Sequence, residues 1–145
     1  MLQLISAVEY MHGNRVIHRD LKLGNIFLNA NMEMKVGDFG LAAKLEFADE
    51  KKRTMCGTPN YIAPEIVEGS VGHSYEVDIW SMGVIAYEII YGKPPYKDKM
   101  DSKLYELINN VPIQQLFDPS VSISNEYKNF IFQCLQIDPL ARATP

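Results

Sequence analysis

Apolar residues repeat at helical spacing from the first residue of the chain. Positions 1, 4, 5, 8 and 11 are apolar and share one face of a helix. We expect this helix to end at Gly13, because glycine readily takes the left-handed conformation that caps helices. No capping residue precedes the segment, which predicts a chain that begins inside a helix.

Short strands and a long polar loop are expected next. Residues 15–17, 26–28 and 34–36 are short apolar segments, and Asn29-Ala30-Asn31 between the last two is typical of a turn. These segments predict two short β-hairpin elements. Residues from 44 to 58 are charged and aperiodic, which predicts a mobile loop.

The second half of the chain predicts a mainly α-helical fold with short β-hairpins. Residues 77–91 are hydrophobic on nearly every face, which is typical of a helix buried in a core, and Gly92 ends it. Asp101 or Ser102 is expected to cap a short helix, and Ser124 is expected to cap another. Residues 144–145, Thr-Pro, match the start of a further helix, so both ends of the chain are expected to be truncated.

Composition narrows the class of protein. The chain has 145 residues, 47% hydrophobic and 22% charged, as expected for one soluble globular domain. A net charge of −4 argues against nucleic acid or an anionic membrane as a partner. No apolar run approaches the roughly 20 residues that span a bilayer. The two cysteines form no metal or redox motif, so we expect an intracellular protein with reduced thiols. His12 and His73 have no partners in the sequence and are expected at the surface.

Three polar segments interrupt the helical pattern. They read HRDLKLGN over residues 18–25, DFG over residues 38–40 and GTPNYIAPE over residues 57–65. Any one string is short enough to occur by chance, but all three in this order are specific. In these segments the chain resembles the serine/threonine protein kinases. The resemblance implies the large, C-terminal lobe of a kinase domain over residues 1–145, with a catalytic loop at 18–25, an activation segment at 38–65 and no N-terminal lobe.

The resemblance implies transfer of a phosphoryl group from ATP to serine or threonine residues of protein substrates. Asp20 would accept the proton of the substrate hydroxyl, and Lys22 would lie beside the transferred group. Asn25 and Asp38 would hold Mg²⁺ against the phosphates, because amide and carboxylate oxygens are hard ligands. Lys22, Asn25 and Asp38 would thus bind the cofactors, ATP and Mg²⁺. Thr58 matches a substrate-binding position of the serine/threonine class.

Other matched residues imply structural support. His18 matches a histidine that supports the catalytic loop. Glu65 and Arg142 match a buried ion pair that fastens the activation segment to the lobe. Asp78 has two interpretations. An acid that opens a buried helix is stabilised by the helix dipole in any fold, whereas the matching kinase residue accepts backbone hydrogen bonds from the catalytic loop.

Thr54 follows the basic residues 51–53 and matches the site at which an upstream kinase would activate the enzyme. Arg19 would receive the phosphate, which adds nearly two negative charges. Many kinases carry a second basic residue at the position of Ala43. Here Lys44 comes one residue later, and on a strand its side chain would point to the opposite face.

The catalytic-loop string, and GTPNYIAPE preceded by Cys56, resemble polo-like kinases most closely. That resemblance implies a role in cell division and a location at the spindle or centrosome. Two alternatives stay open: a catalytically inactive lobe or pseudokinase that acts as a scaffold, and a NIMA-related or calcium/calmodulin-type kinase. Intact Asp20, Asn25 and Asp38 argue against a scaffold, and the missing N-terminal lobe argues for one. We expect the isolated chain to be inactive.

Overall fold

Helices make up most of the regular structure. The computed structural model describes residues 1–69, 72–98 and 101–145. Its α-helices are α1 (Leu2–Gly13), α2 (Pro64–Glu68), α3 (Glu76–Tyr91), α4 (Asp101–Asn110) and α5 (Asn125–Cys134). Its strands form two antiparallel pairs, β1 (Val16–Ile17) with β4 (Ala43–Lys44) and β2 (Ile26–Leu28) with β3 (Met34–Val36). The predicted helix-rich class with short antiparallel strands is confirmed. Strands β2 and β3 form a hairpin as expected, whereas β1 pairs with the distant β4 and is not part of a hairpin.

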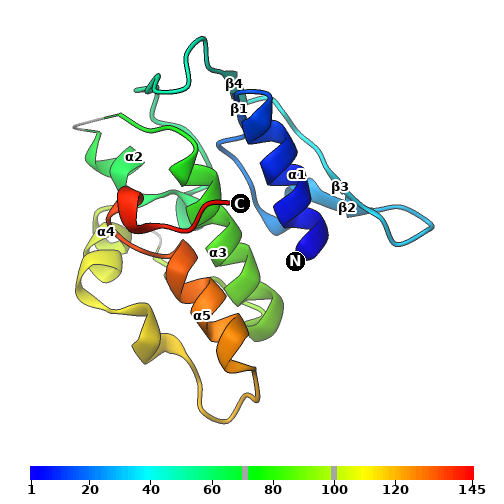
Figure 1. Cartoon of the computed structure of the whole chain (residues 1–145). Coiled ribbons are helices and arrows are strands. Elements are labelled where there is room, and N and C mark those ends of the chain that lie inside the picture. The colour runs from blue at the N-terminus through cyan, green and yellow to red at the C-terminus, as the bar shows by residue number, and fades with distance from the viewer. Residues whose placement is uncertain (70–71, 99–100) are drawn as a thin grey trace.

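Helix α3 is the centre of the molecule. It lies between α1 and the strands on one side and α5 on the other (Figure 1). Every residue from Val77 to Tyr87 is buried, which confirms the predicted core helix. One face packs Ile79, Met82 and Ile85 with apolar residues of α1, and the other packs residues such as Trp80 and Val84 with apolar residues of α5. Because α3 is packed on both sides, the side chains of its first turn, such as Asp78, are held in fixed positions.

Gly83 sets the distance between α3 and α5. A Cβ atom at this position would lie 2.7 Å from the Cβ atom of Cys134 and 2.8 Å from the Cγ atom of Leu135. Contacts this short do not occur between real side chains, so only glycine permits the close approach of the two helices. Cys134 is buried there as a free thiol, and Cys56 is a half-buried free thiol.

The predicted helix ends at Gly92 and Ser124 are confirmed, and α1 ends at Gly13 as predicted but without a left-handed glycine cap. Gly92 follows α3 at φ 69°, and the Ser124 hydroxyl caps α5 by accepting a hydrogen bond of 3.2 Å from the Tyr127 amide. Gly13 is the last helical residue, and Asn14 is the cap. The side-chain amide of Asn14 donates to the Tyr10 carbonyl at 2.8 Å, so the last turn closes without a left-handed glycine. Helix α4 begins at Asp101, and its predicted cap involves a side chain outside the described residues.

Residues 45–58 are irregular, as their pattern predicts. Leu45 is fully buried and anchors the start of this stretch, whereas Phe47 and Met55 are 67% and 60% exposed. Among the described residues, no helix is long and apolar enough to cross a membrane.

Candidate active site

The backbone of the catalytic loop is fixed by one buried carboxylate. The amides of His18 and Arg19 donate to the two oxygens of Asp78, at 2.8 Å and 2.9 Å. Asp78 stands in the first turn of α3 and is fully buried. Arg19 takes a left-handed backbone at φ 66°, which costs about 1–2 kcal/mol for a residue other than glycine. The two hydrogen bonds to a charged acceptor offset that cost and aim the next residue, Asp20, toward the cluster of polar side chains.

His12 completes this arrangement, and the expectation that it lies at the surface is wrong. Its Nε2 atom lies 2.9 Å from Oδ2 of Asp78, and its ring packs 4.9 Å from that of Tyr75. Only 9% of the His12 side chain is exposed. Its partner is 66 residues away in sequence, so no local pattern could have revealed it. His73 is also misplaced by that expectation, since it is only 3% exposed.

Four polar side chains gather where Asp20 emerges. Oδ1 of Asp20 accepts from the Thr58 hydroxyl at 2.7 Å, and Oδ2 accepts from Nζ of Lys22 at 3.0 Å. Nζ of Lys22 also donates to Oγ1 of Thr58 at 2.9 Å. The Asn25 amide donates to the backbone carbonyl of Asp20 at 2.9 Å. The structure therefore brings together Asp20, Lys22, Asn25 and Thr58, although Thr58 is distant from the others in sequence.

The environment of Asp20 favours its ionised form. Burial on its own would raise the pKa of this carboxyl group. Hydrogen bonds from Thr58, Lys22 and Asn25, together with the charge of Lys22, outweigh burial and lower the pKa of Asp20 below its ordinary value. Asp20 is thus a carboxylate at neutral pH and accepts hydrogen bonds.

The DFG segment lies against the catalytic loop. The Gly37 amide donates to the Asn25 carbonyl at 2.9 Å, and the His18 ring contacts the Gly37 carbonyl at 3.0 Å. The rings of His18 and Phe39 meet edge to face at 4.9 Å. These contacts place exposed Asp38, which has φ 57°, beside the loop that carries Asn25.

Asn25 and Asp38 fit a hard divalent cation. The amide nitrogen of Asn25 is used by Asp20, which leaves its carbonyl oxygen for a ligand. Oδ1 of Asp38 accepts from the Gly40 amide at 3.2 Å, which leaves Oδ2. Mg²⁺ accepts such a sparse protein set because it keeps waters and phosphate oxygens in its shell. Within the described residues, no group of three or more His, Cys, Asp and Glu side chains is arranged to hold a metal ion by itself.

Phe27 is a candidate binding residue that was missed in the sequence. It lies on β2, two residues after Asn25, and is 55% exposed. Its ring packs closely against Gly37, since a Cβ atom added to this glycine would lie 2.8 Å from Cε2 of Phe27. An aromatic ring exposed next to two metal-type ligands offers an apolar surface for a flat ligand group. The sequence does show three consecutive apolar residues in this strand, but so short a strand does not reveal which of its side chains face the solvent.

Glu65 and Arg142 form a fully bidentate pair. The two guanidinium nitrogens lie 2.6 Å and 2.7 Å from the two carboxylate oxygens, and both residues are buried. Further donors of Arg142 bind the carbonyls of Gln136 and Glu76, and the guanidinium lies 5.1 Å from the ring centre of Trp80. The pair joins the end of the activation segment to the last residues of the chain.

Thr54 lies outside these clusters. It is exposed, and its side chain makes no hydrogen bond within the described ranges. Arg19 is half-buried, and its Nε atom donates to the Leu41 carbonyl at 2.7 Å. Within the described residues, the structure shows no hydrogen bond between Thr54 and Arg19.

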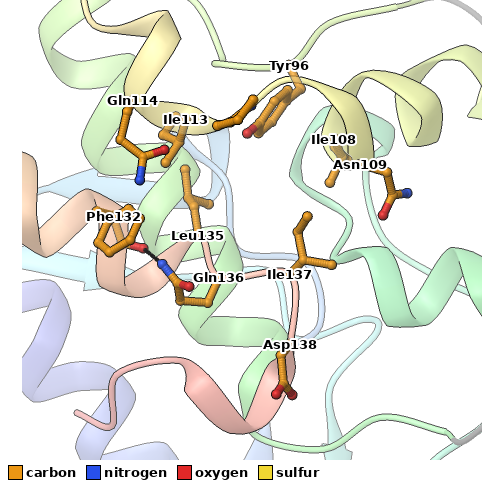
Figure 2. Close-up of a pocket in the computed structure, with 11 residues that line it drawn as sticks. Tyr96, Ile108, Asn109, Ile113, Gln114, Phe132, Leu135, Gln136, Ile137 and Asp138 are labelled. Atoms are coloured by element: carbon orange, nitrogen blue, oxygen red, sulfur yellow. Dashed lines mark hydrogen bonds between the residues drawn. The ribbon is translucent and has the colours of Figure 1, made fainter.

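A hollow lies away from these residues. Figure 2 shows it beside α4 and α5, lined by residues that include Tyr96, Ile113 and Gln136. Its volume is about 250 Å³. Its carboxylate, Asp138, accepts from the Leu140 amide at 3.0 Å and closes a local turn. The cluster around Asp20, which joins a carboxylate, an amine, an amide and a hydroxyl, is the candidate reaction site.

Comparison with known proteins shows the family to which the chain belongs. The model of the protein kinase domain matches residues 1–145. The chain is 53% identical over 97% of its length to a probable serine/threonine-protein kinase, CCRP1, of Zea mays. It is 50% identical over 98% of its length to the serine/threonine-protein kinase PLK1 of Xenopus laevis, and 50% identical over 97% to the cell cycle serine/threonine-protein kinase CDC5/MSD2 of Saccharomyces cerevisiae. It spans 22%, 23% and 20% of the lengths of these relatives. The chain therefore belongs to the protein kinase family and is similar to its polo-like serine/threonine kinases.

Proposed function

We propose that this chain is the large lobe of a polo-like serine/threonine protein kinase and carries its phosphoryl-transfer machinery. The observation that carries the proposal is the cluster in which Thr58 and Lys22 both bind the ionised carboxylate of Asp20. Residues 18–25 act as the catalytic loop, and residues 38–65 act as the activation segment. The relatives' names support a role in the cell cycle, and through it a location at the spindle or centrosome.

Asp20 orients the attacking hydroxyl. In the structure one oxygen of Asp20 accepts from the hydroxyl of Thr58, which shows the direction from which an alcohol can donate. A serine or threonine hydroxyl of the substrate would donate to the same carboxylate and pass its proton there, while its oxygen bonds to the γ-phosphorus of ATP and the bond from that phosphorus to ADP breaks. Lys22 lies between Asp20 and Thr58 and would stabilise the negative charge of the transferred group.

Asn25 and Asp38 hold the cofactor. Mg²⁺ bound to ATP would supply charge neutralisation at the phosphates. The carbonyl oxygen of Asn25 and the free oxygen of Asp38 are the ligands that this chain offers to the ion. The exposed ring of Phe27 would offer the base of the nucleotide an apolar face, which stabilises a planar aromatic group.

Thr54 is the regulatory site of this proposal. An upstream kinase would phosphorylate it, and the guanidinium of Arg19 would bind the phosphate. Nη1 and Nη2 of Arg19 donate to no other group in the described part of the chain, so they are available for this role. A phosphate held there would order the activation segment next to Asp20.

The proposed phosphoryl transfer can be tested by fusing this chain to the small, N-terminal lobe of a kinase domain. The 145-residue chain alone, and a fusion with the small lobe of a similar polo-like kinase, are compared for Mg-ATP binding by calorimetry and for radiolabel transfer to casein. We expect the chain alone to bind ATP weakly and transfer nothing, because half a cleft does not position the nucleotide. The fusion should bind ATP and transfer phosphate. A folded fusion that binds ATP but never transfers phosphate would instead identify a scaffold.

A further inference from the structure

Two backbone hydrogen bonds join the activation segment to the loop before α3. The Lys52 amide donates to the His73 carbonyl, and the His73 amide donates to the Lys52 carbonyl, both at 2.9 Å. We call this pair of residues the 52–73 bridge. Because Lys52 precedes Thr54 by two residues, the bridge fixes the backbone just ahead of the proposed phosphorylation site.

Gly72 is shaped for this bridge. Its backbone is left-handed at φ 77°, and a Cβ atom there would lie 3.0 Å from the Lys52 carbonyl oxygen and 3.1 Å from Cβ of Lys51. Both the backbone conformation and the close approach require glycine. Gly69 provides a contrast, because it has nearly the same backbone, at φ 67°, and its nearest atom is 4.0 Å away.

His73 is buried beneath the bridge with a free nitrogen. The residue is 3% exposed, and its Nε2 atom has no hydrogen-bond partner within the described ranges. Lys52, its bridge partner, directs its own charge to Glu50 at 2.5 Å. The other charged groups whose electrostatic fields act on the imidazole are Arg19 of the catalytic loop, Glu65 of α2, and Glu76 and Asp78 of α3. Burial, and then the charge of Arg19, lower the pKa of His73, although the three carboxylates act in the opposite direction.

We propose that the 52–73 bridge is a switch that is closed while the imidazole of His73 is neutral and opens when His73 takes up a proton. In the closed bridge a proton would add a buried cation beside Arg19. In the open bridge the ring is hydrated and accepts the proton freely. The inference rests on the proposed function only for the role of Thr54, whose backbone would be released when the bridge opens.

The sign of the pH dependence follows from the two states. The pKa of His73 is lower in the closed bridge than in the open one, where it has the ordinary value near 6.5. The bridge is therefore at full strength above about pH 6.5 and weakens as the pH falls below it. Between pH 7.5 and pH 5.5 the ratio of open to closed bridge should rise by up to about tenfold, for an open-state pKa near 6.5.

Trypsin reports on the bridge because it cleaves after the basic residues 51–53. We expect Gly72→Ala to speed this cleavage about tenfold, since the added methyl group overlaps the bridge backbone. Gly69→Ala is the matched control, with the same backbone strain and no overlap, and should speed it far less. Cleavage after Lys128 in α5 reports global unfolding and should be unchanged in both variants. Equal cleavage of the two variants at residues 51–53 would overturn the proposal.

Hydrogen exchange tests the dependence on His73 and needs no kinase activity, so its outcome is independent of the proposed function. In the unmodified chain the amides of Lys52 and His73 should be protected, and their opening, corrected for intrinsic rates, should rise up to tenfold from pH 7.5 to 5.5. In His73→Leu the rise should vanish. Lack of protection in the unmodified chain, or the same rise in His73→Leu, would refute the switch. This measurement also decides the matter if Gly72→Ala unfolds the whole chain.

Discussion

The catalytic loop and the middle part of the activation segment differ in how they are held. In the loop, His18, Asp20 and Asn25 are almost fully buried, and backbone amides bind a buried carboxylate of the core helix. In residues 45–58, large apolar side chains such as Phe47 and Met55 are exposed, and the backbone is attached at Leu45 and at the 52–73 bridge. One region keeps its geometry because it is tied to α3. The other has fewer ties, so it should open locally at a lower free energy than the loop.

The largest expected effect comes from the loop's reactive group. Asp20→Asn should lower phosphoryl transfer in the fusion protein by about 10²–10⁴-fold, the usual worth of a positioned acid-base group. The fold should survive, because the loop is held through backbone amides and Asp78, not through the side chain of Asp20. Transfer rates and ATP titrations measure the two effects separately. Turnover close to that of the unsubstituted fusion would remove Asp20 from the role of base.

The rear end of the activation segment should respond through stability. Glu65→Gln leaves the guanidinium of Arg142 buried without its counter-charge, which costs about 3–5 kcal/mol for a buried pair. Urea unfolding of the 145-residue chain measures this loss. Glu68→Gln is the control, since Glu68 is an exposed acid of the same helix. Similar unfolding midpoints for the two variants would mean that the pair does not fasten the segment.

Substitution of His12 tests whether the catalytic loop depends on the hydrogen bond between His12 and Asp78. His12→Ala removes a donor from a buried carboxylate and should cost about 1–3 kcal/mol. His12→Gln keeps an amide donor and should recover part of that loss. The amides of His18 and Arg19 should exchange faster in His12→Ala, as measured by NMR, while the amide of Leu45 in the other region should not change.

Lys22 should set the pH at which Asp20 loses its charge. Lys22→Met removes a hydrogen bond and a positive charge that lower the pKa of Asp20, so this pKa should rise. Asp20 contributes as a carboxylate above its pKa, and the acidic limb of the rate profile should therefore move to higher pH. Rates of the fusion protein and of its Lys22→Met variant between pH 4 and 8 measure the shift. An unmoved limb would assign it to another group.

The sequence predicted most of the catalytic loop and the helix that holds it, but few of the contacts of the activation segment. Helical periodicity located α3, and the HRDLKLGN string named Asp20, Lys22 and Asn25, which the structure brings together with Thr58. The contacts of His12 and His73 were missed because their partners lie far away in sequence and meet them only through the packing of α1, α3 and the activation segment. Gly72 carried a signal, but a glycine in a loop does not reveal which backbone approaches it.

The smallest expected effect on stability is at Thr54. Its side chain is exposed and makes no hydrogen bond in the described structure, so Thr54→Ala should change the free energy of unfolding by less than about 0.5 kcal/mol. Activity of the fusion protein should nevertheless fall, because phosphate could no longer bind Arg19. Thr54→Asp should restore activity only partly. One reason is that a carboxylate has less negative charge than a phosphate. The other is that the position expected to supply a second basic residue is Ala43. The nearest cation, Lys44, is the next residue on β4, where it pairs with Val16 of β1, so its side chain points to the opposite face. Phosphopeptide mapping and rate measurements on the three proteins check this. An unmodified Thr54 in the active enzyme, together with full activity of Thr54→Ala, would show that the segment is not controlled at this residue.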